Sequence, residues 1–483
     1  MDINLVEKQH KKGKLYVEER LQLLFDEQRY TEITKPEERD GVYVCEGLVS
    51  GKRVIVAAQD FTFMGGTLGL RHGRNIAMGL DRAIRMKCPF IAVNDSGGAR
   101  IQEGIDALCG YGGIFYRNVR ASGRIPQISM ILGPCAGGAV YSPGITDFIF
   151  MTDNISQMFI TGPKVIHAVT GETITGEALG GTVMHGVNSG VAHVCTDTEL
   201  ECFMQVRRLV GMLPPNCRER RLHCYVDANA PQFRFALPED AHRGYDVTDV
   251  INSIFDTRSF MELQPDFAKS VVVGLAKLGG ETVGIIANQP KYMAGVLDCN
   301  SSDKAARLVR FCDAFRIPIV TFTDVPGYLP GVAQEQAGII RHGAKLLYAF
   351  SEATVPKINV ILRKAYGGAY IAMNSAHIGA DCVFSWPGSE VAVMGEQGAV
   401  EILYARETRH MDSQEARAFL SQKAGEYRRA VMNNRLGLQR GYINAEIRPE
   451  KTRDKLIEQL NRLGYKAAIR RIIARKRHGN IPL

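Results

Sequence analysis

The segment Ile125–Leu132, with the sequence IPQISMIL, and the glycine pair Gly137-Gly138 after it decide the fold, because both occur twice in the chain. The second copies are Val355–Leu362, with the sequence VPKINVIL, and Gly367-Gly368. The spacing between the two strings equals the spacing between the two glycine pairs. Self-similarity at a fixed distance predicts that the chain holds two copies of one domain.

The repeat continues on both sides of these segments. Upstream, Phe90–Gly98 matches Ile317–Gly327, with Asp95 and Asp324 at the same place in the two copies. Downstream, residues 146–150 match residues 379–384 around a shared aspartate. Because the spacing between matched positions stays nearly constant along the repeat, chance is a poor explanation. We expect each domain to span about 230 residues.

Within each copy, short apolar stretches alternate with segments of helical periodicity, which is typical of a layered α/β fold. The predicted strands of the first copy are 90–94, 128–132 and 148–151, with helices at 105–122 and from Gly137 onward. Those of the second copy are 318–322, 357–362 and 382–385, with helices at 339–351 and from Gly367 onward.

A polar, proline-containing segment separates the two copies. Leu213–Gly244 contains four prolines and few apolar residues, as is typical of a domain boundary. We therefore expect one domain over residues 1–230 and another over residues 240–483. Helices are predicted at both ends of the chain, over Lys14–Phe25 and within Lys451–Lys476.

The overall composition is that of a globular protein, with 45% hydrophobic and 23% charged residues. The net charge of +8 suits a small anionic ligand better than a nucleic acid. The eleven cysteines form no CxxC pair, so we expect no metal site. Their odd number and the polar N-terminus favour the reducing cytoplasm. The longest apolar stretch, Ile125–Ile145, is interrupted by polar residues and prolines, which predicts no membrane span.

The glycine pairs are the strongest chemical signal. A glycine pair that opens a helix exposes consecutive backbone N–H groups, and such donors suit an oxyanion or a phosphate. The alternative is close packing of a helix on a strand. The occurrence of Gly137-Gly138 and Gly367-Gly368 at the same place in both copies favours the oxyanion interpretation.

Other polar residues have ordinary explanations. Asp95 and Asp324 follow buried strands and are interpreted as turn-forming residues rather than acids. Ser96 lacks the GxSxG context of a nucleophile. Arg341–Lys345 suits phosphate binding and a solvated helix face about equally. The scattered histidines show no metal-binding spacing; they are His167, His185, His193, His342 and His377.

Several long strings closely resemble the biotin-dependent acyl-CoA carboxyltransferases. The family includes β subunits of propionyl-CoA and acetyl-CoA carboxylases, the large transcarboxylase subunit and α subunits of methylmalonyl-CoA decarboxylases. The resemblance covers nearly the whole chain. The most specific strings are Asn94–Glu103 (NDSGGARIQE), Gly133–Pro143 (GPCAGGAVYSP), Met158–Pro163 (MFITGP), Gly327–Lys345 (GYLPGVAQEQAGIIRHGAK), Glu352–Lys357 (EATVPK) and His478–Leu483 (HGNIPL).

The resemblance implies a duplicated crotonase-like fold, with acyl-CoA bound by the N-terminal domain and carboxybiotin by the C-terminal domain. It also implies a homohexamer in which the N-terminal half of one chain faces the C-terminal half of another. Gly137 and Gly138 match the backbone donors to a thioester enolate, and Gly98 and Ala99 match a further oxyanion donor. Gly368 and Ala369 match the donors to the biotin ureido oxygen. Ile371 matches a position that lines the acyl pocket.

The implied reaction moves CO₂ from carboxybiotin to the α carbon of a short-chain acyl-CoA. The chain has no ATP-binding P-loop and no Ala-Met-Lys-Met tetrapeptide for covalent biotin. The resemblance therefore implies separate partners, a biotin carboxylase and a biotin carboxyl carrier, with coenzyme A as part of the substrate.

Three alternatives stay open. The chain could be the carboxyltransferase subunit of a sodium-pumping methylmalonyl-CoA decarboxylase, a crotonase hydratase or isomerase, or a non-catalytic assembly subunit. The duplication argues against a plain hydratase, and intact glycines at both helix starts argue against an assembly role. The string Gly65–His72 departs from that of many relatives, and the zinc ribbon of the bacterial split acetyl-CoA carboxylases is absent.

Overall fold

The computed structural model describes residues 3–218, 222–226, 229–240 and 243–473. The chain divides into two compact units, Met1–Arg220 and Arg221–Leu483. Each unit is built on its own sheet.

The first unit contains an eight-stranded mixed sheet in the order β1-β2-β3-β4-β5-β6-β8, with β7 paired to β5. The first three strands are antiparallel, and β3, β4, β5, β6 and β8 are parallel. The strands are β1 (Tyr30–Glu32), β2 (Val42–Val49), β3 (Lys52–Gln59), β4 (Phe90–Ser96), β5 (Gln127–Ala136), β6 (Phe148–Thr152), β7 (Gln157–Phe159) and β8 (Val194–Thr196).

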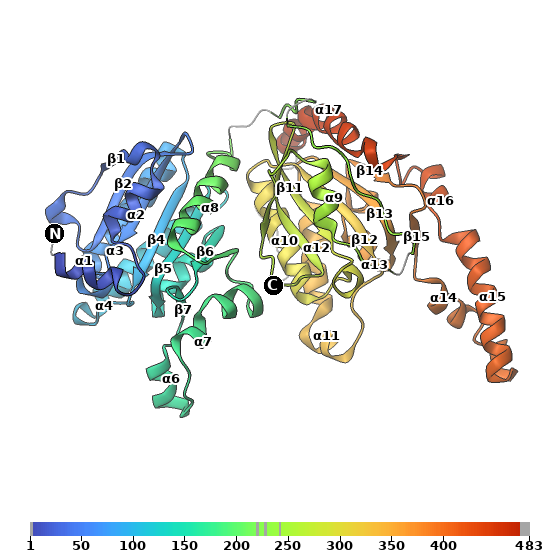
Figure 1. The fold of residues 1–483 in the computed structure, drawn as a ribbon, viewed down its shortest axis with the longest axis horizontal. Coiled ribbons are helices and arrows are strands. Elements are labelled where there is room, and N and C mark those ends of the chain that lie inside the picture. The colour runs from blue at the N-terminus through green and yellow to red at the C-terminus, as the bar shows by residue number, and fades with distance from the viewer. Residues whose placement is uncertain (1–2, 219–221, 227–228, 241–242, 474–483) are drawn as a thin grey trace. The chain divides into compact units, whose positions relative to one another are not determined.

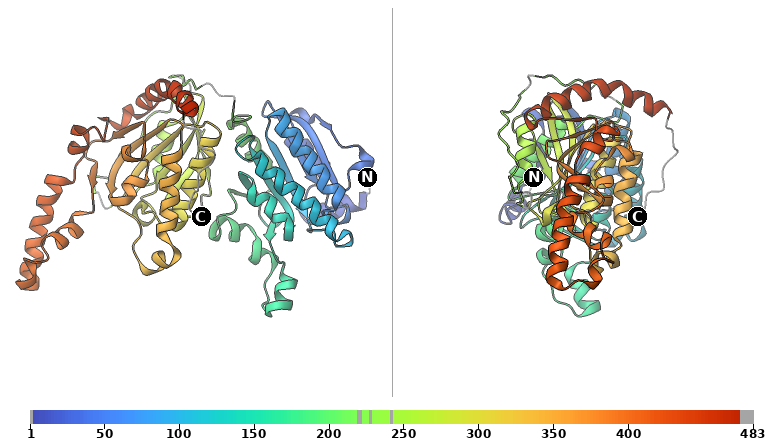
Figure 2. Two further views of the ribbon diagram at one scale, coloured as in Figure 1. Left: turned by 180° about the vertical axis from the view of Figure 1, so that it is seen from behind. Right: turned by 90° about the vertical axis from the view of Figure 1, so that its right-hand side faces the viewer.

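Helices cover both faces of this sheet. Figures 1 and 2 show α2 and α8 over one face, and α3 and α4 side by side over the other. The apolar core lies between the sheet and the α3–α4 pair, and includes Leu80, Phe90 and Ile114. The helices are α1 (Ile3–His10), α2 (Val17–Leu24), α3 (Leu70–Met86), α4 (Ile105–Ala121), α5 (Tyr141–Ile145), α6 (Pro163–Thr170), α7 (Gly176–Gly180) and α8 (Glu199–Met212).

The second unit repeats this topology strand for strand. Its sheet has the order β9-β10-β11-β12-β13-β14-β16, with β15 paired to β13. The strands are β9 (Met261–Leu263), β10 (Val271–Leu278), β11 (Glu281–Asn288), β12 (Ile319–Val325), β13 (Lys357–Tyr366), β14 (Cys382–Ser385), β15 (Glu390–Ala392) and β16 (Ala445–Glu446). The predicted duplication of one α/β fold is confirmed.

The second sheet also lies between helix layers. Side chains of α9 and α17 pack into one core with Trp386, whose Nε1 donates to Thr452 Oγ1 at 2.9 Å. Figure 1 shows α14 and α15 projecting from the body of this unit. The helices are α9 (Val247–Ile254), α10 (Cys299–Ala314), α11 (Val332–Ala337), α12 (Ile339–Glu352), α13 (Gly367–Ala372), α14 (Glu396–Leu403), α15 (Ser413–Val431), α16 (Arg435–Gln439) and α17 (Thr452–Ile473).

Most predicted elements lie where expected, but β4, β5, β12 and β13 run further than predicted, β5 and β13 by four residues each. The strand predicted over 128–132 continues to Ala136, and the one predicted over 357–362 continues to Tyr366. The extra residues pair with β7 and β15, in the registers Cys135↔Met158 and Ala365↔Val391. Pairing with β7, which comes later in the chain, thus keeps Gly133-Pro134 extended, although the sequence around these two residues predicted the end of the strand.

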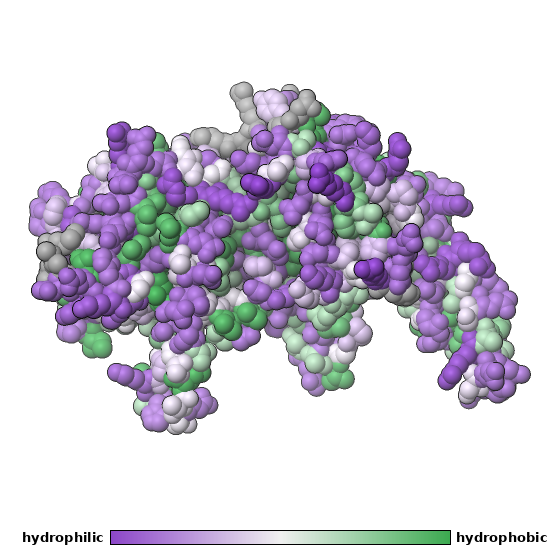
Figure 3. All heavy atoms as spheres, viewed as in Figure 1, coloured by the Kyte–Doolittle hydropathy of each residue, from purple (hydrophilic) through white to green (hydrophobic). Residues whose placement is uncertain are grey.

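The surface is mostly polar on the face drawn in Figure 3, with apolar patches on projecting segments such as α6. Val165 and Val169 on α6 are more than half exposed. Among the described residues, none of the helices has the length and apolar character that crossing a membrane requires.

Candidate functional site

Each unit carries a helical turn that starts directly after its extended strand. In the first unit, Gly137 follows β5 and adopts a φ of +63°, a conformation that favours glycine. A 3₁₀ turn, Gly137–Val140, leads into α5. The first N–H groups of such a turn have no acceptor within it, so the backbone at Gly137 and Gly138 offers donors.

The surroundings of this turn are tightly packed. A Cβ at Gly138 would lie 3.3 Å from the ring of Tyr111, a buried residue of α4 whose pKa is raised by burial. Gly98, with a φ of +105°, approaches from the end of β4, and a Cβ there would lie 3.0 Å from the Ala136 carbonyl oxygen. The structure thus brings Gly98 and the Gly137 turn together.

The backbone of Gly98 is already engaged. Its N–H donates to Ser96 Oγ at 3.2 Å, and its carbonyl accepts from the N–H of Leu68 at 2.9 Å. Ala99 is half-buried beside it and lies opposite Leu68 in an isolated parallel bridge. Ser96 is fully buried and bonded within this turn, an arrangement that suits a structural hydroxyl.

The second unit repeats the turn at α13. Gly367 follows β13 with a φ of +60°, and a Cβ there would lie 3.0 Å from the Val393 carbonyl oxygen. Gly368 is exposed, with no heavy atom within 4 Å of where its Cβ would lie. Ala369 is fully buried. The first N–H groups of α13 also have no acceptor within the helix, so the backbone at Gly368 and Ala369 offers donors.

Ile371 lies on the outer side of α13. Its side chain is 37% exposed, whereas the neighbouring Tyr370 is 7% exposed and packs edge-on against His377, with ring centroids 5.9 Å apart. Ile371 is thus available to a ligand beside the helix, and Tyr370 is directed elsewhere.

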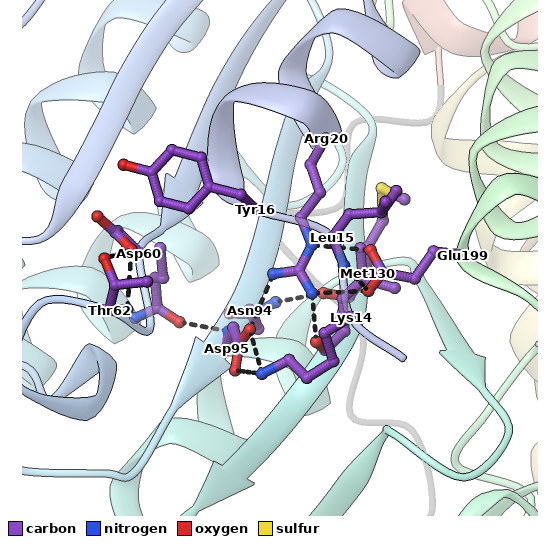
Figure 4. Close-up of polar contacts among 12 residues, drawn as sticks. Lys14, Leu15, Tyr16, Arg20, Asp60, Thr62, Asn94, Asp95, Met130 and Glu199 are labelled. Carbon is purple, nitrogen blue, oxygen red and sulfur yellow. Dashed lines mark hydrogen bonds and ion pairs between the residues drawn. The ribbon is translucent and has the colours of Figure 1, made fainter. Parts of the chain in front are cut away.

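The interpretation of Asp95 and Asp324 as turn-forming residues is wrong. Both lie in strands, and each is 1% exposed. Lys14 Nζ lies 2.7 Å from Asp95 Oδ1, and Arg20 Nη1 lies 2.8 Å from Asp95 Oδ2. Figure 4 shows the Asp95 carboxylate between these two cations, with Arg20 also bound to Glu199.

Asp324 has different partners. Arg363 Nε lies 3.0 Å from Asp324 Oδ2, the Tyr245 hydroxyl donates to the same oxygen at 2.9 Å, and the Lys364 N–H donates to Oδ1 at 3.1 Å. Burial raises the pKa of Asp324, and Arg363 opposes that shift. Burial lowers the pKa of Lys14 in the first unit, where the charge of Asp95 acts against it.

The remaining predicted candidates are bonded within their own surroundings. Asp303 holds both His342 and Lys345, at 2.8 Å and 3.0 Å. His185 contacts the Met158 carbonyl oxygen, and His193 Nδ1 accepts from the Ile149 N–H. In the described part of the chain, His, Cys, Asp and Glu side chains form no group of three or more suited to a metal ion.

A cavity of about 290 Å³ opens beside the second turn. Tyr366, the residue before Gly367, binds Glu390 through its hydroxyl, and Arg428 of α15 donates twice to Glu390 at 2.7 and 2.9 Å. Lys364 and the start of α14 also line this cavity. The projecting α14–α15 hairpin is thereby anchored next to the donor turn of α13.

The comparisons with known proteins agree over almost the full length. Residues 8–481 match the carboxyl transferase domain family. The chain belongs to this family. It is a carboxyltransferase of the propionyl-CoA carboxylase β type, a biotin-dependent class that acts on CoA substrates.

The carboxyltransferase has close relatives in two kinds of enzyme. It is 48% identical to the carboxyltransferase subunit of propionyl-CoA carboxylase from Haloferax mediterranei, over 98% of this chain and 95% of that one. It is also 48% identical to the methylmalonyl-CoA decarboxylase α subunit of Veillonella parvula, over 99% and 95% of the two chains.

Its fold matches that of transcarboxylase 12S, with a TM-score of 0.93 and 43% identity over 99% of this chain and 95% of that one. That structure is described as a hexamer with hydrolysed methylmalonyl-coenzyme A bound. The predicted duplicated crotonase-like fold of the carboxyltransferase is confirmed.

The buried cations around Asp95 and Asp324 were missed by the sequence analysis. One signal was available, since the two aspartates occupy equivalent places in the repeat. The cations that bind Asp95, Lys14 and Arg20, are distant from it in sequence and carry no motif. The cation that binds Asp324, Arg363, lies on the next strand of the sheet and carries no motif either.

Proposed function

We propose that the chain is the carboxyltransferase subunit of a biotin-dependent acyl-CoA carboxylase. It transfers the carboxyl group of carboxybiotin to the α carbon of a short-chain acyl-CoA such as propionyl-CoA or acetyl-CoA. The carrying observation is the pair of donor turns that begin at Gly137 and Gly367, at equivalent places in the two repeats. The proposed donors are Gly137 and Gly138 in the first turn and Gly368 and Ala369 in the second. The reaction requires two oxyanions to be stabilised, and the chain provides one donor turn for each.

The first turn serves the acyl substrate. Removing the α proton of a thioester places negative charge on its carbonyl oxygen, and preorganised N–H donors lower the energy of that charge. Gly137 and Gly138 supply these donors. Gly98 and Ala99 form the facing wall, and Ala99 is the better placed donor of the two because the Gly98 N–H already binds Ser96.

The second turn serves the ureido oxygen of the biotin group. Gly368 is exposed at the start of α13, and Ala369 follows it with an N–H of the same turn. Carboxybiotin, carried by a separate protein or domain, supplies the carboxyl group and the base for the α proton. The chain therefore needs no side-chain base, in keeping with the bonded states of its buried histidines His72 and His193.

Ile371 contributes to the choice of acyl chain. Its exposed apolar surface on α13 favours additional methylenes in the substrate. We propose acceptance of acetyl-, propionyl- and butyryl-CoA without a sharp preference for propionyl-CoA.

The active assembly is a cytoplasmic homohexamer in which the N-terminal half of one chain faces the C-terminal half of another. An apolar stripe on α4 supports assembly, because Ile105, Leu108, Tyr116 and Val119 are each more than 60% exposed in the single chain. The hexameric transcarboxylase 12S relative supports the same state. Biotin carboxylase and the biotin carboxyl carrier subunit complete the enzyme.

The second candidate function is the α subunit of a methylmalonyl-CoA decarboxylase, which runs the transfer in reverse. The 48% identity to the Veillonella parvula subunit supports it as strongly as the Haloferax mediterranei relative supports the carboxylase. Mass spectrometry of the native complex separates the two, because a carboxylase co-purifies with a biotin carboxylase and a decarboxylase with a membrane pump.

The proposal is tested by reconstitution. The purified chain should not carboxylate acyl-CoA with bicarbonate and ATP alone. It should do so once a biotin carboxylase and a biotinylated carrier, or free biotin, are added. Activity of the chain without biotin would refute the assignment.

A further inference from the structure

The buried aspartates of the two repeats are equivalent but are neutralised from different places in the chain. Asp95 and Asp324 occupy the same place in the repeat, near the ends of the matching strands β4 and β12. An amide side chain on the preceding strand accepts the N–H of each aspartate: Gln59 Oε1 at 3.0 Å from Asp95 N, and Asn288 Oδ1 at 3.3 Å from Asp324 N. The two halves therefore share a common frame around the carboxylate.

The cation for Asp324 comes from the neighbouring strand. Arg363 lies on β13, between Ile361 and Ala365, and its Nε reaches the Asp324 carboxylate within the same sheet. The first repeat has Gly133 at this position, because Ile131 and Cys135 pair with β4 as Ile361 and Ala365 pair with β12. The first repeat thus lacks the cation that the second repeat supplies from its own strand.

The absence of a side chain at Gly133 makes room for the Asp95 carboxylate and for Lys14 of the N-terminal segment. A Cβ at Gly133 would lie 1.9 Å from Asp95 Oδ1 and 2.8 Å from Lys14 Nζ. Lys14 instead reaches Asp95 through this space, and Arg20 of α2 binds the other carboxylate oxygen. Figure 4 shows both side chains converging on Asp95.

The network also holds β5, the other strand that leads to the first donor turn. Arg20 Nη2 donates to the Leu132 carbonyl oxygen at 2.7 Å, directly before Gly133. Glu199 of α8 completes the charge balance, accepting from Arg20 Nε at 2.8 Å and from the Leu15 N–H at 3.0 Å. Two cations and two carboxylates therefore lie together, each 6% exposed or less.

The position of the network gives it a functional consequence. Asp95 lies directly before Ser96, the last residue of β4, and Leu132 lies on β5, which ends at Ala136 directly before Gly137. These two strands lead to the first donor turn and its facing wall. We infer that Lys14 and Arg20 of the N-terminal segment are positioning residues, which hold the ends of β4 and β5 at the first oxyanion site. They take the place that Arg363 has in the second repeat.

This inference rests on the proposed function, since it assigns the network to the acyl half of the carboxyl transfer. Misplacing a reacting group by about 1 Å can cost on the order of 10²-fold in rate. Loss of Lys14 should therefore lower kcat while the KM for acyl-CoA changes little, because the CoA portion of the substrate does not contact the buried network.

The test removes the cation at position 14 and then restores it. Lys14→Met should lower kcat by about 10- to 100-fold. Lys14→Arg keeps a cation on the N-terminal segment and should recover at least part of the kcat that Lys14→Met loses. A side chain at Gly133 cannot substitute for Lys14, because its Cβ would lie 1.9 Å from Asp95 Oδ1. Arg29→Met, which removes an ion pair whose partners are 83% and 72% exposed, is the matched control and should leave kcat unchanged.

Hydrogen exchange of the intact chain provides a readout that does not depend on activity. Lys14→Met should increase exchange at residues 96–99 and 133–138, and Lys14→Arg should show less of this increase. A folded Lys14→Met protein with kcat within twofold of the wild type would overturn the positioning role, as would a folded Lys14→Arg protein no faster than Lys14→Met. An inactive wild-type chain with these exchange changes would instead count against the proposed function.

Discussion

Replacement of Gly368 by proline removes one backbone donor from the second turn with little other change. Gly368 is the second residue of α13, and proline is tolerated in the first turn of a helix because the N–H there has no acceptor within the helix. No heavy atom outside the neighbouring residues lies within 4 Å of the place where its Cβ would be. Loss of one oxyanion donor costs about 10²- to 10³-fold in rate, or about 2.7–4 kcal/mol of transition-state stabilisation.

Gly368→Ala is the matched control. Alanine keeps the N–H, fits the same open space, and is a better helix former than glycine by about 0.8–1.0 kcal/mol. We expect Gly368→Ala to transfer carboxyl groups at the wild-type rate and Gly368→Pro to be slower by about 10²-fold or more. The assay measures kcat for transfer from a carboxylated biotin carrier to propionyl-CoA.

Folding is checked in the same preparations by circular dichroism and the thermal unfolding midpoint. The KM for acyl-CoA should be unchanged in Gly368→Pro, because the second turn faces the biotin group in this account. A folded Gly368→Pro protein with a transfer rate within threefold of Gly368→Ala would refute the role of this N–H.

Three further outcomes are expected. Gly138→Pro should lower transfer by about 10²- to 10³-fold through loss of a donor to the thioester oxygen, measured as kcat in protein whose circular dichroism is unchanged. Ile371→Asp should lower the butyryl-to-propionyl ratio of kcat/KM about fourfold, the equivalent of one buried methylene at about 0.8 kcal/mol; an unchanged ratio would identify Ile371 as a packing residue. Burial lowers the pKa of His72 from 6.5 to about 4, so the unfolded chain takes up a proton in this range before the folded chain does. The free energy of unfolding should then fall as the pH decreases from about 6.5 to about 4, and His72→Gln should flatten that dependence in urea titrations.

The duplicated fold was predictable because its signals are local. Apolar strands, helical periodicity and the glycine pairs recur in both halves, and the helix expected over 105–122 is observed as Ile105–Ala121. The extensions of β5 and β13 were not predictable from local sequence. They depend on pairing with β7 and β15, and Gly133-Pro134 on its own is typical of a turn.

The donor turns were found for a similar reason. A glycine pair after a buried strand indicates exposed backbone N–H donors from the local sequence alone. Both Gly137 and Gly367 adopt positive φ in the structure. The aspartates were misinterpreted because their meaning depends on cations far away in the sequence, such as Lys14 for Asp95. Only the folded chain shows how the two buried carboxylates are neutralised. Lys14 reaches Asp95 beside Gly133, whereas Arg363, at the position equivalent to Gly133, binds Asp324.

A single-turnover chase measures directly whether the chain transfers the carboxyl group from biotin to acyl-CoA. A biotin carrier is first loaded with radiolabelled carboxyl groups by a biotin carboxylase, freed of ATP and bicarbonate, and then mixed with the purified chain and propionyl-CoA. We expect the label to move to methylmalonyl-CoA at a rate proportional to the concentration of the chain. Gly368→Pro should slow this movement, whereas Gly368→Ala should not. Label that stays on the carrier, or is released as CO₂ without reaching the acyl-CoA, would contradict this expectation.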